Sequence, residues 1–335
     1  MKTKPTIAIT MGDPSGIGPE LCLKLLENKD VYNFCNPVIF GNSTILNLAA
    51  EKLNLTTPLR VISHEKWQQL ERAPDDINAI NIGDFDQNSL AIGKISKKSG
   101  KASYHYIDEA IIAARKNKVD AITTCPINKY SIKMAGCKLP GHTEIFAEKT
   151  SSKKYCMMQY SSEITASFVT SHVGLKEACS MITEERIIQV IELTSSALNS
   201  INDSKPKNIV VCGLNPHSGE NGLFGENEEE KIIIPAIEKA TSMGYEVKGP
   251  SVPDTAFIPE KRKSTGAYIW MYHDQGLIPL KALAFDEAVN ITLGLPIIRT
   301  SVDHGTAFDI AWKGLANVNS LIKATELASK MCSLK

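Results

Sequence analysis

The segment that decides the fold is residues 6–26, TIAITMGDPSGIGPELCLKLL. Thr6–Thr10 is a short β-branched and apolar run typical of a buried strand, and Gly18–Leu26 has the pattern of a helix. The glycines between them permit positive φ, and the new helix N-terminus favours an anion. They lack the GxGxxG spacing, however, and no acidic residue after a second strand completes a dinucleotide fingerprint. The segment is therefore a ligand-binding turn or a plain tight turn, not a Rossmann motif.

Strand-like and helix-like segments alternate along the rest of the chain. Further strands are expected at 38–40, 121–124, 166–170, 208–212, 268–272 and 289–293. Helices are expected at 43–53, 104–116, 183–198, 226–240 and 306–312. This alternation, with few hairpin signals, predicts the α/β class with a largely parallel sheet. A length of 335 residues favours two domains, because one domain has roughly 100–200 residues.

Composition and charge exclude several classes of partner. The 37 basic and 37 acidic residues give zero formal charge, which argues against nucleic acid. Neither a basic amphipathic helix nor an apolar run of about 20 residues suggests a membrane. Gly12 and Asp13 come too early for the apolar region of a signal peptide, and the eight cysteines contain no CxxC. We expect a soluble cytoplasmic protein with reduced thiols.

Residues suited to anion binding recur near the C-terminal end. Lys281, Asn290 and Arg299 are nine residues apart between apolar segments. Lysine and arginine offer an anion a point charge and a bidentate fork, which indicates a phosphorylated or carboxylated small molecule. His142 and Thr143 precede a helix-like run, where Thr143 could cap the helix or could contact an anion together with His142.

Three histidines each follow a predicted strand, namely His172, His217 and His273. A divalent metal with an open coordination position needs three such ligands. Their spacing matches no local zinc motif, so hydrogen-bonded structural histidines are the alternative. His217 lies in NPHSGENGLFGENE, which we interpret as a flexible loop near a metal or as a plain surface loop. Asp254 could orient a ligand or accept a proton.

Taken together, these segments resemble the 4-hydroxythreonine-4-phosphate dehydrogenases of the vitamin B6 pathway. The resemblance covers almost the whole chain and includes MGDPSGIGPE, TCPINK, GHTE, TSHV, NPHSGENGLFGENE, GPSVPDTAF, YHDQGLIPLK and DHGTAFDIAWKG. It implies two α/β/α lobes around a cleft, like those of isocitrate and isopropylmalate dehydrogenases. We place the first lobe at residues 1–133 plus 304–335 and the second at 134–303.

The resemblance also implies roles for individual residues. It assigns one divalent metal to His172, His217 and His273 in a site shared between the chains of a homodimer. Three histidine ligands favour zinc, with magnesium, manganese and cobalt as alternatives. It assigns substrate contacts to His142, Thr143, Lys281, Asn290 and Arg299. It assigns NAD or NADP to two loops containing Gly12, Asp13, Gly16, Gly18, His304, Gly305 and Ala307. Asp254 and Asp274 are candidates for the proton acceptor, and Asp274 could instead orient His273.

The implied reaction is the oxidation of 4-hydroxythreonine-4-phosphate to 2-amino-3-oxo-4-(phosphooxy)butanoate. This β-keto acid then loses carbon dioxide to give 3-amino-2-oxopropyl phosphate. The nearest alternative is a dehydrogenase for threonate or erythronate 4-phosphate on the same scaffold. A metabolite-binding protein without catalysis and a metal-dependent hydrolase are the alternatives from other classes.

Overall fold

The computed structural model describes residues 4–201, 205–284 and 287–332. The described chain forms two compact units, unit 1 with residues 4–153 and 295–332 and unit 2 with residues 154–294. The boundaries expected from the sequence were near 133 and 304. The chain leaves unit 1 later because α7 (His142–Lys149) packs against α5 (Lys97–Arg115). It returns earlier because β12 (Ile298–Ser301) pairs with β5 (Ala121–Thr124).

Unit 1 is built on a parallel sheet. Its strand order is β3-β4-β2-β1-β5-β12. The remaining strands are β1 (Thr6–Thr10), β2 (Asn36–Gly41), β3 (Val61–Ser63) and β4 (Ala79–Asn81). Every residue of β1 and β5 is buried, as expected for parallel strands covered on both faces. The loops that follow β1, β5 and β12 therefore leave the same edge of the sheet.

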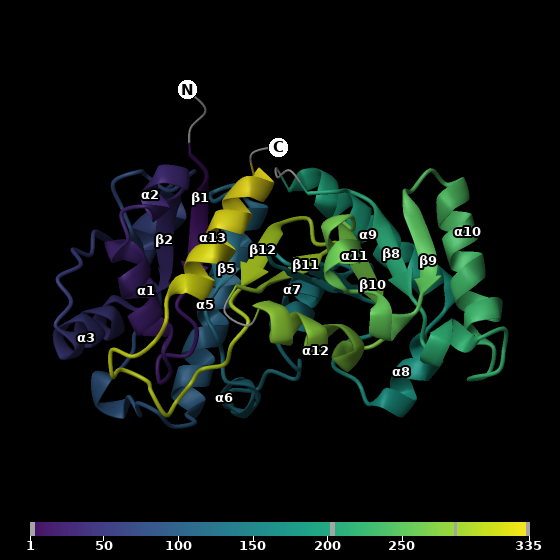
Figure 1. Cartoon of the computed structure of the whole chain (residues 1–335). Coiled ribbons are helices and arrows are strands. Elements are labelled where there is room, and N and C mark those ends of the chain that lie inside the picture. Colours follow the sequence, from purple (N-terminus) through teal and green to yellow (C-terminus); the bar gives the residue numbers. More distant parts are fainter. Residues whose placement is uncertain (1–3, 202–204, 285–286, 333–335) are drawn as a thin grey trace. The chain divides into compact units, whose positions relative to one another are not determined.

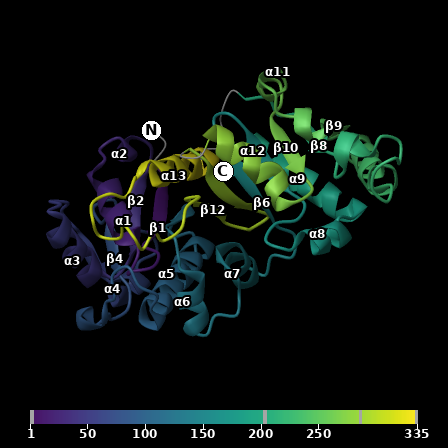
Figure 2. The ribbon, with the colours of Figure 1, turned by 60° about the horizontal axis from the view of Figure 1, so that its bottom comes forward.

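Helices cover the sheet of unit 1. In Figure 1, α13 (Asn319–Cys332) crosses in front of β5 and β12, both of which it contacts. Figure 2 shows α5 beside α6 (Lys129–Met134) and α7. The other helices are α1 (Gly18–Glu27), α2 (Val31–Phe34), α3 (Ser43–Leu53), α4 (His64–Gln69) and the 3-10 turn η1 (Gln87–Ser89). Several helices begin at a side-chain cap, as Asn42 does for α3 by accepting from the backbone N–H of Ile45 at 3.2 Å.

Unit 2 has a mixed sheet with the order β11-β6-β7-β10-β8-β9. β6 pairs antiparallel with β11 and β7, and the other pairs are parallel. The three adjacent strands β7, β10 and β8 run in the same direction, so the loops after them share one edge. The strands are β6 (Cys156–Tyr160), β7 (Thr165–Phe168), β8 (Ile209–Cys212), β9 (Val247–Ser251), β10 (Ala267–Trp270) and β11 (Val289–Leu293).

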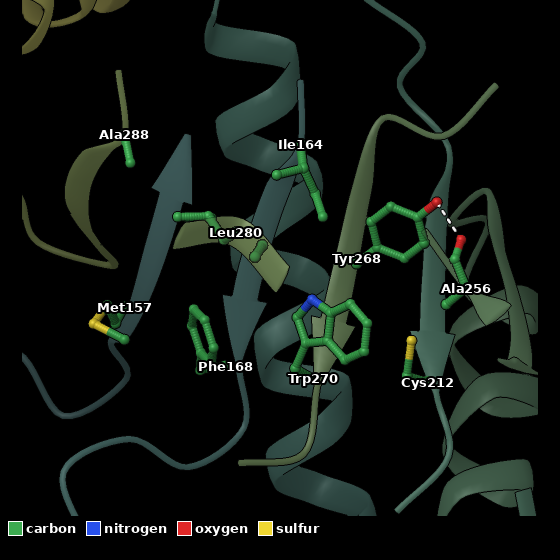
Figure 3. Packing of buried hydrophobic residues seen from close by; sticks show 10 residues of the cluster. Met157, Ile164, Phe168, Cys212, Ala256, Tyr268, Trp270, Leu280 and Ala288 are labelled. Carbon is green, nitrogen blue, oxygen red and sulfur yellow. Dashed lines mark hydrogen bonds between the residues drawn. The ribbon is translucent and has the colours of Figure 1, made fainter. Parts of the chain in front are cut away.

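The core of unit 2 centres on aromatic residues of β7 and β10. Phe168 and Trp270 are almost fully buried beside Leu280, and Tyr268 donates to the carbonyl of Ala256 at 2.7 Å (Figure 3). The helices of this unit are α8 (Leu175–Met181), α9 (Glu184–Ser200), α10 (Ile234–Ser242), α11 (Pro259–Lys263) and α12 (His273–Ala284). Its short turns are η2 (Pro216–Gly219), η3 (Glu229–Ile233) and η4 (Pro253–Thr255).

Most of the expected elements are present, and one is wrong. The expected helix at 306–312 is a series of turns, because Ala307 and Trp312 adopt positive φ of 42° and 60°, which no helix allows. The expected helix at 226–240 begins later, as the π-helical turn η3 followed by α10. The cap predicted at Thr183 is confirmed, since its hydroxyl accepts from the backbone N–H of Arg186 at 3.1 Å. None of the described helices is long and apolar enough to span a lipid bilayer.

The close approach of α12 to the sheet gives a test of this packing. A Cβ at Gly276 would lie 2.6 Å from Trp270 and 2.7 Å from Phe168. Alanine normally stabilises a helix by about 1 kcal/mol relative to glycine. Here we expect Gly276→Ala to lower the free energy of unfolding by roughly 1–3 kcal/mol, because the core would be overpacked. Urea unfolding measures this change. Gly174→Ala is the control, since its Cβ meets no atom within 4 Å, and an equal or higher midpoint for Gly276→Ala would contradict the packing.

Candidate active site

Arg299, one of the predicted anion-binding residues, is a buried cation in unit 1. Arg299, on β12, is only 2% exposed. Its Nη2 donates to the Thr124 hydroxyl at 2.8 Å, and its guanidinium lies 5.4 Å from the ring centre of Phe146. Burial lowers the pKa of Arg299 to about 9, and the nearby Glu144 carboxylate opposes this shift. The guanidinium therefore stays charged at neutral pH, held in place by an aromatic face and a hydroxyl.

His142 is the first residue of α7 and lies beside Arg299. Its ring centre is 6.5 Å from that of Phe146, and its buried Nε2 has no hydrogen-bond partner in the described part of the chain. Burial, followed by the charges of Arg299 and Lys129, lowers the pKa of His142 well below its usual value. The imidazole is thus neutral at pH 7, and its Nε2 is available to a ligand. The expectation that Thr143 caps this helix is wrong, because Gly141 is the N-cap and Thr143 lies in the first turn.

Lys281 and Asn290, the other predicted substrate residues, belong to unit 2. Asn290 lies on β11, and its buried Oδ1 has no hydrogen-bond partner among the residues described. Since a buried amide oxygen without a partner is costly, this atom is a candidate ligand contact. Lys281 is half-buried near the end of α12. Arg299, His142 and Thr143 belong to unit 1.

The two predicted cofactor loops contact each other within unit 1. The backbone N–H of Ile17 donates to the carbonyl of Thr306 at 3.1 Å, and the indole of Trp312 donates to the carbonyl of Pro14 at 3.2 Å. A Cβ at Gly16 would lie 2.9 Å from the Thr306 carbonyl oxygen, so only glycine allows this approach. The structure therefore brings the loop containing Gly12, Asp13, Gly16 and Gly18 to the loop containing His304, Gly305 and Ala307.

Asp13 is a buried carboxylate within the first of these loops. It is 0% exposed, and its Oδ1 accepts from the backbone N–H of Ser15 at 2.9 Å. Its backbone N–H donates to the Pro126 carbonyl at 3.0 Å, which ties the loop to the segment after β5. Burial raises the pKa of Asp13 to about 6, although hydrogen bonds from Ser15 and Ser131 oppose this shift. The group therefore titrates close to physiological pH.

His172 and His273 come together in unit 2. They follow the adjacent parallel strands β7 and β10, and their ring centres are 5.6 Å apart. A cavity of about 360 Å³ is lined by both rings, by Asp274 and by residues of α8. The Nδ1 of His273 lies 2.6 Å from Oδ1 of Asp274. A carboxylate on one ring nitrogen fixes the tautomer of a histidine and leaves the other nitrogen for a metal.

His217 does not join these two histidines. No group of three or more His, Cys, Asp or Glu side chains close enough to hold a metal occurs in the described ranges. His217 lies beyond the end of β8, with left-handed backbone (φ 53°), and its Nδ1 is 2.9 Å from the Glu220 carboxylate. The described residues thus provide part of a zinc-type donor set, because two imidazoles meet whereas such a site has three or more protein ligands.

The two predicted acids differ in their surroundings. Asp274 contacts His273, as described above, whereas Asp254 is an exposed residue of η4. Sequence reasoning missed three residues around the predicted site. Thr124 accepts a hydrogen bond from Arg299, the charge of Glu144 acts on Arg299, and Glu229 accepts from Leu214 and Asn215 in the loop before His217. Thr124 could have been found, since it ends a strand in a polar group. The two glutamates lie in acidic or helical segments without a distinctive pattern.

Comparison with known proteins shows the family. The sequence profile described as pyridoxal phosphate biosynthetic protein PdxA matches residues 33–328. A protein of Oceanobacillus iheyensis, named provisionally as a D-threonate 4-phosphate dehydrogenase, is 43% identical over 338 residues, covering 100% of both chains. A 4-hydroxythreonine-4-phosphate dehydrogenase of Desulforapulum autotrophicum is 40% identical over 331 residues, covering 99% of this chain and 96% of its own.

A solved structure supports the same assignment. The 4-hydroxythreonine-4-phosphate dehydrogenase of Klebsiella pneumoniae superposes with a TM-score of 0.83 at 38% identity, covering 98% of this chain and 100% of its own. The fold and these relatives define the chain as a dehydrogenase of the α/β class. It belongs to the PdxA family of pyridoxal phosphate biosynthesis.

The raised pKa of Asp13 predicts a specific pH dependence. An unfolded aspartate titrates near 3.9, so the folded protein binds this proton more tightly. The contribution of Asp13 to stability is therefore fully present below about pH 4 and is lost as pH rises through about 6. Relative to the parent, Asp13→Asn should gain on the order of 1–3 kcal/mol between pH 4 and pH 7. Urea midpoints at both pH values measure this gain, with exposed Asp30→Asn as control. Equal pH dependence in the parent and Asp13→Asn would rule the effect out.

Proposed function

We propose that the chain catalyses the NAD(P)- and divalent-metal-dependent oxidation of 4-hydroxythreonine-4-phosphate. The product, 2-amino-3-oxo-4-(phosphooxy)butanoate, then decarboxylates to 3-amino-2-oxopropyl phosphate. The observation that carries this proposal is the buried pair of a charged Arg299 and a neutral His142 in a chain similar over its full length to dehydrogenases of that name. A buried guanidinium suits a phosphate or carboxylate, to which it can donate two parallel hydrogen bonds.

The substrate-binding residues have different tasks in this proposal. Arg299 binds the phosphate through its planar fork, and Lys281 adds a point charge. Asn290 offers an amide to the same anionic substrate. His142 stays neutral, so its Nε2 can exchange a hydrogen bond with the substrate without adding another charge beside Arg299. Thr143 places a hydroxyl one residue further along the first turn of α7.

The metal site is proposed to be shared in a homodimer, with zinc as the favoured ion. Its support is that one chain brings only His172 and His273 together within its described residues. His217 of the partner subunit would complete the set. Exposed apolar side chains of unit 2, including Leu175 at 61% and Ile278 at 67%, are suited to such an interface.

Mixing His172→Ala with His217→Ala chains tests this sharing, because only a mixed dimer would then contain an intact ligand set.

The mechanism follows from what these residues can hold. When bound, the metal would lower the pKa of the substrate's secondary alcohol, and the nicotinamide would accept the hydride. Asp274 holds the ring of His273 through Nδ1, so Nε2 can face the ion. Because Asp274 is engaged in this way, Asp254 is the better candidate to accept the alcohol proton. The Gly12–Gly18 and His304–Ala307 loops, already in contact, are proposed to bind NAD or NADP.

A second candidate substrate is threonate or erythronate 4-phosphate. The observation in its favour is the 43% identity to the Oceanobacillus iheyensis protein, which covers the full length of both chains. Both substrates carry a phosphate and a secondary alcohol, so the proposed contacts apply to either. They differ in whether an amine or a hydroxyl stands beside the carboxylate.

The decisive assay follows reduction of NAD and NADP by the zinc-loaded protein with each of the two substrates. Turnover of 4-hydroxythreonine-4-phosphate that a chelator abolishes, with release of carbon dioxide, is the expected result. Preference for threonate 4-phosphate would keep the fold and the metal but change the substrate. Absence of reduction with both would refute the catalytic assignment.

Removal of the buried guanidinium tests the proposed phosphate contact. Arg299→Ala should raise KM about tenfold to several hundredfold, corresponding to the ~1.5–3 kcal/mol of a charged hydrogen bond. The KM of Arg299→Lys should lie between those of the parent and Arg299→Ala, because lysine keeps the charge but loses the planar fork. Steady-state kinetics measures KM, and thermal unfolding of the same samples shows whether each variant is still folded. A KM equal to that of the parent would show that Arg299 does not bind the substrate phosphate.

A further inference from the structure

The loop that carries His217 has an unusual backbone. Between residues 215 and 228, many residues adopt the left-handed conformation that side chains disfavour. They are His217, Ser218, Gly219, Glu220, Asn221, Gly222, Gly225 and Asn227, with φ between 45° and 84°. Such a conformation persists only when surrounding contacts determine it. The sequence predicts either a flexible loop near a metal or a plain surface loop here, whereas this backbone needs specific contacts to hold it.

Glu229 supplies the contacts that precede His217. It is 0% exposed and is the first residue of the π-helical turn η3. Its Oε1 accepts from the backbone N–H groups of Leu214 and Asn215, both at 2.8 Å. Its Oε2 accepts from the side-chain amide of Asn215 at 2.9 Å. One buried carboxylate thus fixes the residues two and three positions before His217.

The same carboxylate also packs against the residue two positions after His217. A Cβ at Gly219 would lie 2.7 Å from Oε2 of Glu229, so the backbone there is in close contact with the acid. Glu228 closes the loop further by accepting from the Asn215 amide at 2.9 Å and from the backbone N–H of Glu226 at 2.7 Å. Glu229 therefore contacts the loop on both sides of His217.

The His217 side chain itself is 61% exposed. It contacts Glu220 and Phe224, which belong to the same loop. The position of the imidazole is therefore set by the backbone that bears it, and that backbone is held by Glu229. We propose that Glu229 is a positioning residue for His217, fixing the loop so that its imidazole can serve as a metal ligand. This inference rests on the proposed function, which takes His217 as a ligand.

Glu229→Gln and Glu229→Ala test this role in the full-length protein. Glutamine keeps one acceptor oxygen but presents an NH₂ group either to the backbone donors or to the Asn215 amide, so the hydrogen bonds cannot all be kept. Competition between the metal-free protein and a chromophoric chelator for Zn²⁺ measures the affinity without any need for activity. Loss of a residue that orients a ligand weakens metal binding about 10- to 100-fold. We expect a loss of this size for Glu229→Gln and a loss at least as large for Glu229→Ala.

Two control variants separate positioning from other effects. Glu184→Gln makes the same chemical change at a half-buried residue of α9 whose side chain is 41% exposed, and Ile191→Val trims a fully buried residue of that helix. Both should bind Zn²⁺ as the parent does, within about twofold, and Ile191→Val should show a lowered melting temperature. Equal loss of Zn²⁺ affinity in Ile191→Val would mean that general destabilisation explains the effect, and would overturn the inference.

His217→Ala distinguishes failure of this inference from failure of the proposed function. Weakened Zn²⁺ binding in His217→Ala, with parent-like binding in both Glu229 variants, would overturn the positioning role and leave the metal site standing. Parent-like binding in His217→Ala would overturn both, since His217 would not be a ligand. Weakened binding in His217→Ala and in both Glu229 variants, with both controls unaffected, is the result that supports the role of Glu229.

Discussion

Buried carboxylates that accept backbone N–H groups hold the loops on which the candidate site depends. Asp13 accepts from Ser15 in the first cofactor loop, and Glu229 accepts from Leu214 and Asn215 in the His217 loop. Glu20, also fully buried, accepts from the backbone N–H groups of Gly314 and Ala316. Irregular segments leave backbone donors without the partners that a helix or strand provides, and a buried donor needs an acceptor. A carboxylate offers two oxygens, so one side chain can fix several residues of a loop.

Burial leaves Arg299 and His142, two neighbouring residues of unit 1, in opposite charge states. It lowers the pKa of both Arg299 and His142, but from very different starting values. The guanidinium therefore remains charged at neutral pH, whereas the imidazole loses its proton. A site with one fixed cation and one neutral ring can bind an anion without concentrating repelling charges. The charge of Arg299 also lowers the pKa of His142, because a second positive charge beside the guanidinium is unfavourable.

The sequence predicts the elements of this fold better than the loops between them. Strands such as β5 and β11 were predicted at their observed bounds, because short apolar runs of buried strands can be recognised in the sequence. The expected helix at 306–312 was wrong, because its backbone follows contacts with the Gly12–Gly18 loop that no local pattern reveals. The pairing of His172 with His273 follows from adjacent parallel strands. The role of Glu229 could not be predicted, because its partners lie 14 and 15 residues away across an irregular loop.

Relatives named for either candidate substrate resemble this chain at similar identity, 43% and 40%, and the two substrates are themselves chemically similar. Both substrates share the phosphate and the secondary alcohol, and the roles proposed for Arg299, for the two glycine-containing loops and for the histidines all concern these shared groups. The amine or hydroxyl that distinguishes them is one small polar group, and a single hydrogen bond to it would contribute about 0.5–3 kcal/mol to binding, depending on its charge. A site that hydrogen-bonds one group rejects the other mainly through polar atoms left unpaired. If both activities occur on this architecture, the choice between the two substrates would therefore depend on the polar side chains that face this one group.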